Sequence, residues 1–188
     1  MEKIPAPERE VQLLAALDRF QATALTARTH PLLGRASLHA STIAGGMGWS
    51  TYPDQCTLRV ERRTLPGETT ATVLAEVELM LAELRSADPQ MRVSVRVDTA
   101  QGPSDVAVDA PLVQRLAAVC TAVRGAPPAV EGLSAWTDAA LLNDAGIPAV
   151  CFGPGDIALA HAATEYVPLS EIDAATAVLT AFALDWCS

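Results

Sequence analysis

Residues 56–97 read CTLRVERRTLPGETTATVLAEVELMLAELRSADPQMRVSVRV, and this stretch decides the fold. Apolar and polar residues alternate over 56–61, as they do in a strand with one buried face. After a proline and a glycine, an apolar stripe over 69–85 predicts a helix. The alternation then returns over 91–97. The stretch therefore predicts strand, helix and strand, joined as a right-handed crossover with parallel strands.

The sequence before this stretch predicts a second helix and a further strand. Apolar residues spaced three and four apart indicate a helix over 8–27, and a weaker alternation over 37–43 is compatible with a strand. The alternate positions of both clearer strands are polar, which leaves one face of the sheet free of helices. The first part, residues 1–100, is therefore predicted to be a two-layer α+β domain.

A linker at 100–104 separates this part from a second part, which is predicted over 105–188. A helix is expected over 110–124, with Asp109 as its cap, Pro111 in its first turn and Gly125 at its end. A short helix over 138–145 and a last helix starting at Ser170 are also expected.

The apolar run over 147–152, between these two helices, predicts a strand that is buried on both faces. The second part thus looks like the last β-α units of a larger α/β domain. Two strands at most make a sheet that rarely covers itself.

Composition excludes several classes of partner. The 188 residues carry a formal net charge of −9, and nucleic acid and anionic membranes both favour clusters of lysine and arginine. No apolar run approaches the roughly 20 residues of a membrane span. The first residues lack the apolar core of a signal peptide, so a cytoplasmic location is expected. The four widely spaced cysteines are interpreted as buried, reduced thiols.

Residues 134–161 contain the leading candidate for a functional residue, because they place His161 at the predicted carboxyl end of a strand. Open α/β sheets place their ligands there, so His161 is a candidate metal ligand or acid/base group. A histidine bonded locally in a loop is the alternative. Glu165, four residues later, is either a partner that orients His161 or a solvated carboxylate.

Three other places have both a functional and a structural interpretation. The turn Gly153-Pro154-Gly155 could present backbone amides to an oxyanion or a carboxylate, or be an ordinary tight turn. Thr137 and Asp138 are candidates for substrate binding or for capping a helix. One arginine of the pair Arg62-Arg63 could bind a carboxylate through two hydrogen bonds, or the pair could form a charged strand end.

The same residues carry a resemblance to a known family. The run from Thr137 to Gly155, followed by Ala160-His161 and Glu165-Tyr166-Val167, resembles the C-terminal end of the acetylornithine deacetylase, succinyl-diaminopimelate desuccinylase and aminoacylase family. Earlier segments resemble that family's lid, or dimerisation, domain: 30–34, 43–46, 52–56 and 61–68. These relatives are dinuclear zinc amidohydrolases and peptidases.

The resemblance implies a fold and a set of roles. It implies a ferredoxin-like lid that lacks its first strand, followed by part of a zinc-binding α/β domain. His161 takes the position of the last zinc ligand, and Arg63 that of the lid arginine that holds the substrate carboxylate. The turn Gly153-Pro154-Gly155 takes the position that lines the substrate site, and the matching run begins at Thr137 and Asp138.

The other ligands and the general base of that family belong upstream of the lid and have no counterpart in this sequence. The expectation is therefore a truncated amidohydrolase, in which complete relatives use zinc, cobalt or manganese and this chain alone holds no metal stably. A non-catalytic dimerisation module, forming a homodimer through the lid, is one alternative. The other is the C-terminal part of a split enzyme, with a second polypeptide supplying the zinc-binding half.

Overall fold

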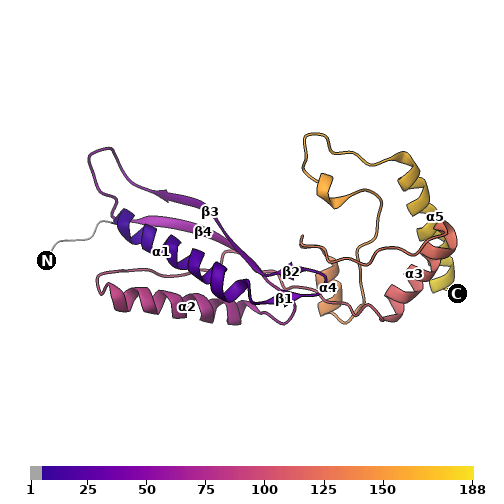
Figure 1. Ribbon diagram of the computed structural model, residues 1–188, viewed down its shortest axis with the longest axis horizontal. Helices are drawn as coiled ribbons and strands as arrows, with labels where there is room; N and C mark the ends of the chain where they lie inside the picture. The colour runs from indigo at the N-terminus through magenta and orange to yellow at the C-terminus, as the bar shows by residue number, and fades with distance from the viewer. Residues whose placement is uncertain (1–5) are drawn as a thin grey trace. The chain divides into compact units, whose positions relative to one another are not determined.

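A computed structural model describes residues 6–188 and divides the chain into two compact units (Figure 1). The boundary lies between Pro103 and Ser104. It falls inside the linker expected at 100–104.

The first unit combines two long helices with a two-stranded antiparallel sheet. The strands β3 and β4 pair from Ser37 opposite Arg63 to Gly45 opposite Cys56, with a bulge between Ala40 and Thr42. The helices α1 and α2 lie against the sheet (Figure 1). In chain order the elements are α1 (Ala6–Phe20), the π-helical turn η1 (Gln21–Leu25), β1 (Thr29–His30), β2 (Gly34–Arg35), β3 (Ser37–Gly45), β4 (Cys56–Arg63) and α2 (Thr70–Ala87).

Local sequence explains where α2 begins, and an ion pair to a distant residue holds its end. The Thr69 hydroxyl accepts a hydrogen bond from the Thr72 amide, and the Thr72 side chain accepts one from the Thr69 amide, which closes a capping box. At the other end the Arg9 Nε lies 2.6 Å from the Asp88 carboxylate, so an ion pair links the start of α1 to the end of α2. The helix predicted over 69–85 is confirmed.

A small apolar core holds the helices on the sheet. It consists of Ala16 and Leu17 of α1 with Met80 and Leu81 of α2. Partly buried side chains surround it: Leu13, Phe20, Leu38, Leu58, Val77, Leu84, Val93 and Val95. Burying a leucine fully contributes roughly 1.5–3 kcal/mol, so this cluster is the main source of cohesion in the unit. The predicted α+β class, with helix and small antiparallel sheets, is confirmed.

The second strand of the predicted crossover is not formed. Residues 91–97 keep the expected burial pattern, since Met91 is buried and Val93 and Val95 are half-buried between exposed residues. Within the described chain they join no sheet, and β4 pairs with β3 instead. The alternation of side chains therefore predicted the inward face correctly, but strand formation also needs a neighbour that accepts and donates backbone hydrogen bonds.

The second unit is helical and has few buried residues. Its elements are α3 (Pro111–Arg124), α4 (Ala139–Asp144), the 3-10 turn η2 (Ile157–Leu159) and α5 (Leu169–Trp186). Gly125 ends α3 with φ of 76°, in the left-handed region as predicted. The predicted cap is wrong, because Ala110 occupies the N-cap position and no side chain caps this end. The buried apolar residues are Cys120, Ala140, Ala175 and Val178.

The run 147–152 is not the doubly buried strand expected from its composition. It joins no sheet in residues 6–188, and Ile147 is 55% exposed. The Asn143 side chain partly replaces a strand neighbour: its amide nitrogen donates to the Ala149 carbonyl at 2.9 Å, and its oxygen accepts from the Ala149 amide at 2.8 Å. The Asn143 side chain provides hydrogen-bond partners for the backbone of one residue, whereas a neighbouring strand would provide them for the whole run.

All four cysteines are free thiols. Burial was expected for them, but only Cys120 is fully buried, and burial raises the pKa of its thiol. Cys56 is half-buried, whereas Cys151 and Cys187 are exposed, because the apolar runs around them lack a covering layer. Among residues 6–188, no helix combines the length and apolar character needed to cross a bilayer.

Candidate functional site

The candidate residues fall into two groups that lie in different units. Arg63 ends β4 in the first unit. The other candidates, 137–138, 153–155 and His161, belong to the second unit.

The two arginines that end β4 have different environments, because neighbouring side chains of a strand point to opposite faces. The Arg62 side chain is only 8% exposed, and its Nη2 lies 2.6 Å from a Glu68 oxygen. The Arg63 side chain is 49% exposed and makes a 3.3 Å contact with Glu61. Of the two, Arg63 is therefore the arginine available to a ligand, whereas Arg62 serves the fold.

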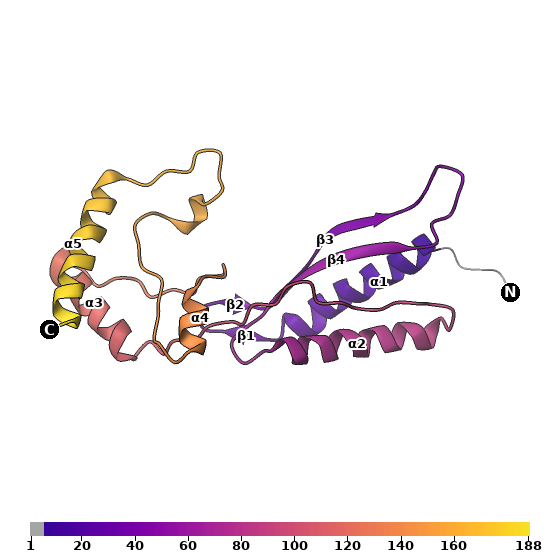
Figure 2. The same cartoon turned by 180° about the vertical axis from the view of Figure 1, so that it is seen from behind.

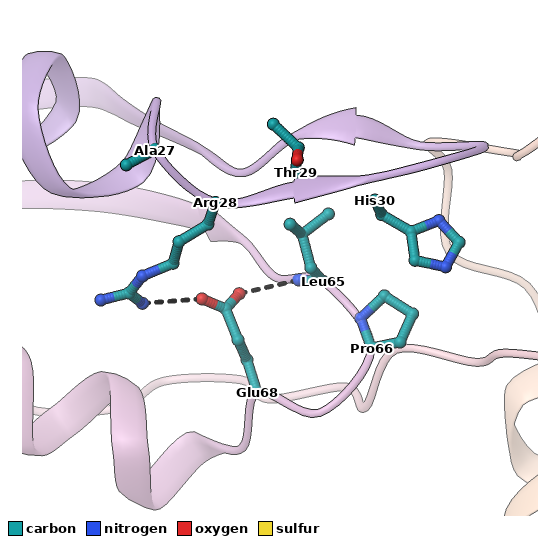
Figure 3. Close-up of a pocket in the computed structure, with 7 residues that line it drawn as sticks. All are labelled: Ala27, Arg28, Thr29, His30, Leu65, Pro66 and Glu68. Atoms are coloured by element: carbon teal, nitrogen blue, oxygen red, sulfur yellow. Dashed lines mark hydrogen bonds and ion pairs between the residues drawn. The ribbon is translucent and has the colours of Figure 1, made fainter.

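Glu68 forms ion pairs with two arginines on the buried side of the end of β4. It accepts hydrogen bonds from Arg28 at 2.8 Å and from the Leu65 amide at 2.7 Å (Figure 3). It also accepts one from Arg62. Burial acts to raise the pKa of Glu68, but the Leu65 amide and the Arg28 guanidinium outweigh it and lower the pKa below its ordinary value. Glu68 is thus a stable anion.

This cluster lines an open cavity of about 390 Å³ in the first unit (Figure 3). The His30 Nδ1 atom accepts from the Leu32 and Leu33 amides, each at 3.3 Å, which fixes the ring at one edge. None of the residues predicted from sequence as ligand-binding lines this cavity. Its walls are Ala27, Arg28, Thr29, His30, Leu65, Pro66 and Glu68. From the sequence, only Glu68, which follows Pro66-Gly67, could have indicated this cavity. The other polar residues of its walls, Arg28, Thr29 and His30, lie far from Glu68 in the sequence.

In the second unit the predicted turn Gly153-Pro154-Gly155 lines a hollow of about 260 Å³. The Gly155 amide donates to the Glu171 carboxylate at 2.8 Å, so an amide of this turn does bind a carboxylate, in this case one from α5. Gly155 has φ of 93°, and a Cβ there would lie 3.1 Å from a Val167 methyl. The turn therefore needs glycine at this position. Sequence reasoning missed Arg124 and Glu171, which line the same hollow from α3 and α5.

Thr137 and Asp138 lie at the start of α4 and act through local contacts. The Thr137 hydroxyl lies 3.3 Å from the Cys151 sulfur, which ties this helix start to the run 147–152. Asp138 occupies the N-cap position, but its carboxylate makes no capping bond. Capping therefore does not account for the Asp138 carboxylate, which is exposed.

His161 has the most unusual backbone of the candidates. Its φ is 64°, and within the described residues it is the only non-glycine with a positive φ. Its amide donates to the Glu165 carboxylate at 3.0 Å, so Glu165 holds the backbone of His161 rather than its ring. The side chain is exposed. Left-handed backbone costs free energy in a residue with a Cβ, and such outliers concentrate at functional sites.

Residues 6–188 do not by themselves fit a metal centre. They contain no group of three or more histidine, cysteine, aspartate or glutamate side chains that could hold an ion. A structural or catalytic zinc site needs at least three protein ligands.

Comparison with known proteins places the chain in a family. Residues 12–185 match the sequence profile of Peptidase family M20/M25/M40. The acetylornithine deacetylase of Myxococcus xanthus is 32% identical over 151 residues, which cover 80% of this chain and 38% of that protein. The N-formyl-4-amino-5-aminomethyl-2-methylpyrimidine deformylase of Bacillus subtilis is 27% identical over 197 residues, which cover 97% of this chain and 46% of that protein.

A shorter match, 49% identical over 37 residues and 20% of this chain, relates it to the N-acetyl-L-citrulline deacetylase of Xanthomonas campestris. The chain spans less than half the length of the first two relatives. The family resemblance read from residues 137–167 and from the lid motifs is confirmed, since the profile covers nearly the whole chain. The chain belongs to the M20/M25/M40 family of hydrolases.

Proposed function

We propose that this chain forms the lid and the C-terminal part of a metal-dependent amidohydrolase that removes an acyl group from the nitrogen of a carboxylate-bearing substrate. The names of three relatives describe removal of acetyl or formyl groups, which supports this reaction class. In this proposal the first unit is the ferredoxin-like lid, Arg63 binds the substrate carboxylate and His161 supplies one ligand to zinc, cobalt or manganese.

The observation that carries the proposal is the left-handed backbone that presents the exposed His161 side chain, within a chain that matches the family over residues 12–185. A single imidazole binds zinc weakly. In this proposal the remaining ligands and the general base come from outside residues 6–188, and we expect residues 6–188 alone to be inactive. A cytoplasmic location is part of the proposal.

The surface of the chain is consistent with a missing partner. It exposes 13080 Å², whereas two separate compact domains of similar total mass would expose about 10,400 Å². Large apolar side chains contribute to the difference in the second unit, among them Ile147 at 55%, Leu184 at 72% and Trp186 at 50% exposure. Apolar surface of this extent is typical of an interface.

Two measurements test the proposal. The chain alone, dialysed after incubation with zinc, should retain no stoichiometric metal and should not hydrolyse N-acetylornithine. A chimera joining this chain to the part of the Myxococcus xanthus deacetylase outside the match should bind metal and hydrolyse an acylated amino acid. His161→Ala should remove metal from the chimera, and Arg63→Ala should raise KM. Tight zinc binding by the chain alone, unaffected by His161→Ala, would refute the assignment.

A second candidate function is a non-catalytic dimerisation module. The outer edge of β3 favours it, because in the described part of the chain this nine-residue strand pairs only with β4. Such an edge is a template for pairing with another copy about a two-fold axis. Light scattering at micromolar concentration tests it, since a monomer would exclude the homodimer.

A further inference from the structure

The outer face of the β3–β4 sheet carries four polar side chains in two neighbouring cross-strand pairs. Both helices of the first unit cover the opposite face (Figure 2). In the antiparallel register, Ser37 lies opposite Arg63 and His39 lies opposite Glu61. Leu38 packs on the helical core, so Ser37 and His39 on either side of it point outward. Directly opposite residues have Cβ atoms about 5 Å apart, so these four side chains form one group, which we call the outer-face cluster.

Within this cluster Arg63 keeps two of its three nitrogens available to a ligand. Its Nε lies 3.3 Å from a Glu61 oxygen, which leaves Nη1 and Nη2 without an acceptor among residues 6–188. The backbone below is held in place, because the Arg62 Nη1 donates to the Arg63 carbonyl and the Arg62 Nη2 lies 2.6 Å from Glu68. A carboxylate is the group that matches such a pair of N–H donors.

Ser37 and His39 add a hydroxyl donor beside this guanidinium. The His39 Nε2 atom lies 3.2 Å from the Ser37 Oγ atom. When Nε2 carries the imidazole proton, it donates to Ser37, and the hydroxyl hydrogen of Ser37 is left for a further acceptor. Because Ser37 lies opposite Arg63, an oxygen of a carboxylate held by the guanidinium is within its reach.

We propose that Ser37 binds the substrate carboxylate together with Arg63, and that His39 is a positioning residue that orients the Ser37 hydroxyl. Glu61 orients the guanidinium in the same way. The identity of the ligand, an acylated amino acid, rests on the proposed function, whereas the residues follow from the outer-face cluster. The negative charge of Glu61 favours a carboxylate, with one charge, over a phosphate, with nearly two.

Nuclear magnetic resonance of the full 188-residue chain tests this binding with N-acetylglycine as the probe. The amides of 37–39 and 61–63 should shift saturably, and N-acetylglycinamide, which lacks the carboxylate, should leave them in place. Ser37→Ala should weaken binding about fivefold, the equivalent of roughly one hydrogen bond. Thr57→Ala, which removes an exposed hydroxyl from the same face of β4, is the matched control and should bind like the wild type. No shift at 37–39, an equal loss in the control, or tighter binding of inorganic phosphate would overturn the proposal.

Two substitutions of His39 separate positioning from a merely structural role. His39→Gln keeps a side-chain N–H for Ser37 and should retain most of the affinity, whereas His39→Leu should match Ser37→Ala. The double variant Ser37→Ala/His39→Leu should bind no more weakly than Ser37→Ala, because His39 acts through Ser37. Equal affinities of His39→Gln and His39→Leu would overturn the positioning role.

The chimera with the Myxococcus xanthus deacetylase distinguishes this proposal from the proposed function. In the chimera, Ser37→Ala should raise KM for N-acetylornithine about fivefold and leave kcat unchanged. An unchanged KM would overturn the role of Ser37 and leave the hydrolase assignment intact. A chimera that binds no metal would refute the hydrolase assignment, and the binding of N-acetylglycine by the chain would still decide the role of Ser37.

Discussion

The Arg62 guanidinium lies 2.6 Å from the Glu68 carboxylate, across the turn that connects β4 to α2. Both side chains are largely buried, with 8% and 13% exposure. The neighbouring pair of Arg63 and Glu61 is about half exposed on both sides. Two adjacent arginines of one strand therefore make ion pairs in different environments. Breaking the buried pair costs more, because it leaves an uncompensated charge away from water.

Glu68→Gln should destabilise the first unit by about 3 kcal/mol, since removing one partner leaves a buried guanidinium without its counter-charge. Urea unfolding followed by circular dichroism measures the change. Glu61→Gln is the matched control, and a change within about 0.5 kcal/mol is expected for that surface pair. Equal effects of the two variants would contradict the distinction between Arg62 and Arg63.

The contribution of Glu68 to the free energy of unfolding should decrease as the pH is lowered. Its pKa in the folded chain is lowered, so the unfolded state binds its proton first as the pH falls. The stabilisation is complete above the ordinary glutamate value of about 4.3 and is lost as the pH falls through the folded value. The difference in unfolding free energy between wild type and Glu68→Gln should be constant from about pH 7 to about pH 6 and shrink below about pH 4. A difference that grows on acidification would contradict this sign.

Asn143→Ala should release the run 147–152. The Asn143 amide makes two hydrogen bonds to the Ala149 backbone and a third to the Ser104 hydroxyl. Each partly buried hydrogen bond contributes roughly 1 kcal/mol. Because water can replace some of the three lost bonds, we expect the second unit to be destabilised by about 2 kcal/mol. Hydrogen exchange at Ala149 should accelerate. Asp144→Ala, an exposed change beside it, should leave that exchange unchanged.

Gly155→Ala should destabilise the turn that lines the hollow in the second unit. The backbone φ of 93° disfavours any residue with a Cβ, and the new carbon would lie 3.1 Å from a Val167 methyl. A loss of about 1–2 kcal/mol is expected. Gly153→Ala is the control, because its Cβ would meet nothing within 4 Å and its φ is not in the left-handed region. Thermal unfolding of both variants makes the comparison.

The elements of this protein could be predicted from sequence wherever the determining contacts are local. Helix α2 begins at a capping box between Thr69 and Thr72, and α3 ends at Gly125, so both are encoded within a few residues. The run from Thr137 to Val167 and the lid motifs likewise identified the family, because such motifs are local patterns.

Sequence reasoning failed where an element depends on a neighbour that is distant or outside the described chain. Both 91–97 and 147–152 have the composition of strands, yet neither joins a sheet in residues 6–188. A helix satisfies its own backbone, whereas a strand requires another segment to do so. The roles of Arg62, Glu171 and Arg124 were also beyond the sequence, since their partners lie on other elements.

The sequence by itself thus determined the helices, the inward face of 91–97 and the family. Only the tertiary structure decided which of two adjacent arginines is buried, which backbone Glu165 holds, and that 91–97 joins no sheet in the described residues. The reason is physical: side-chain periodicity and capping are properties of a few consecutive residues, whereas burial, ion pairing and strand pairing are properties of segments brought together by the fold.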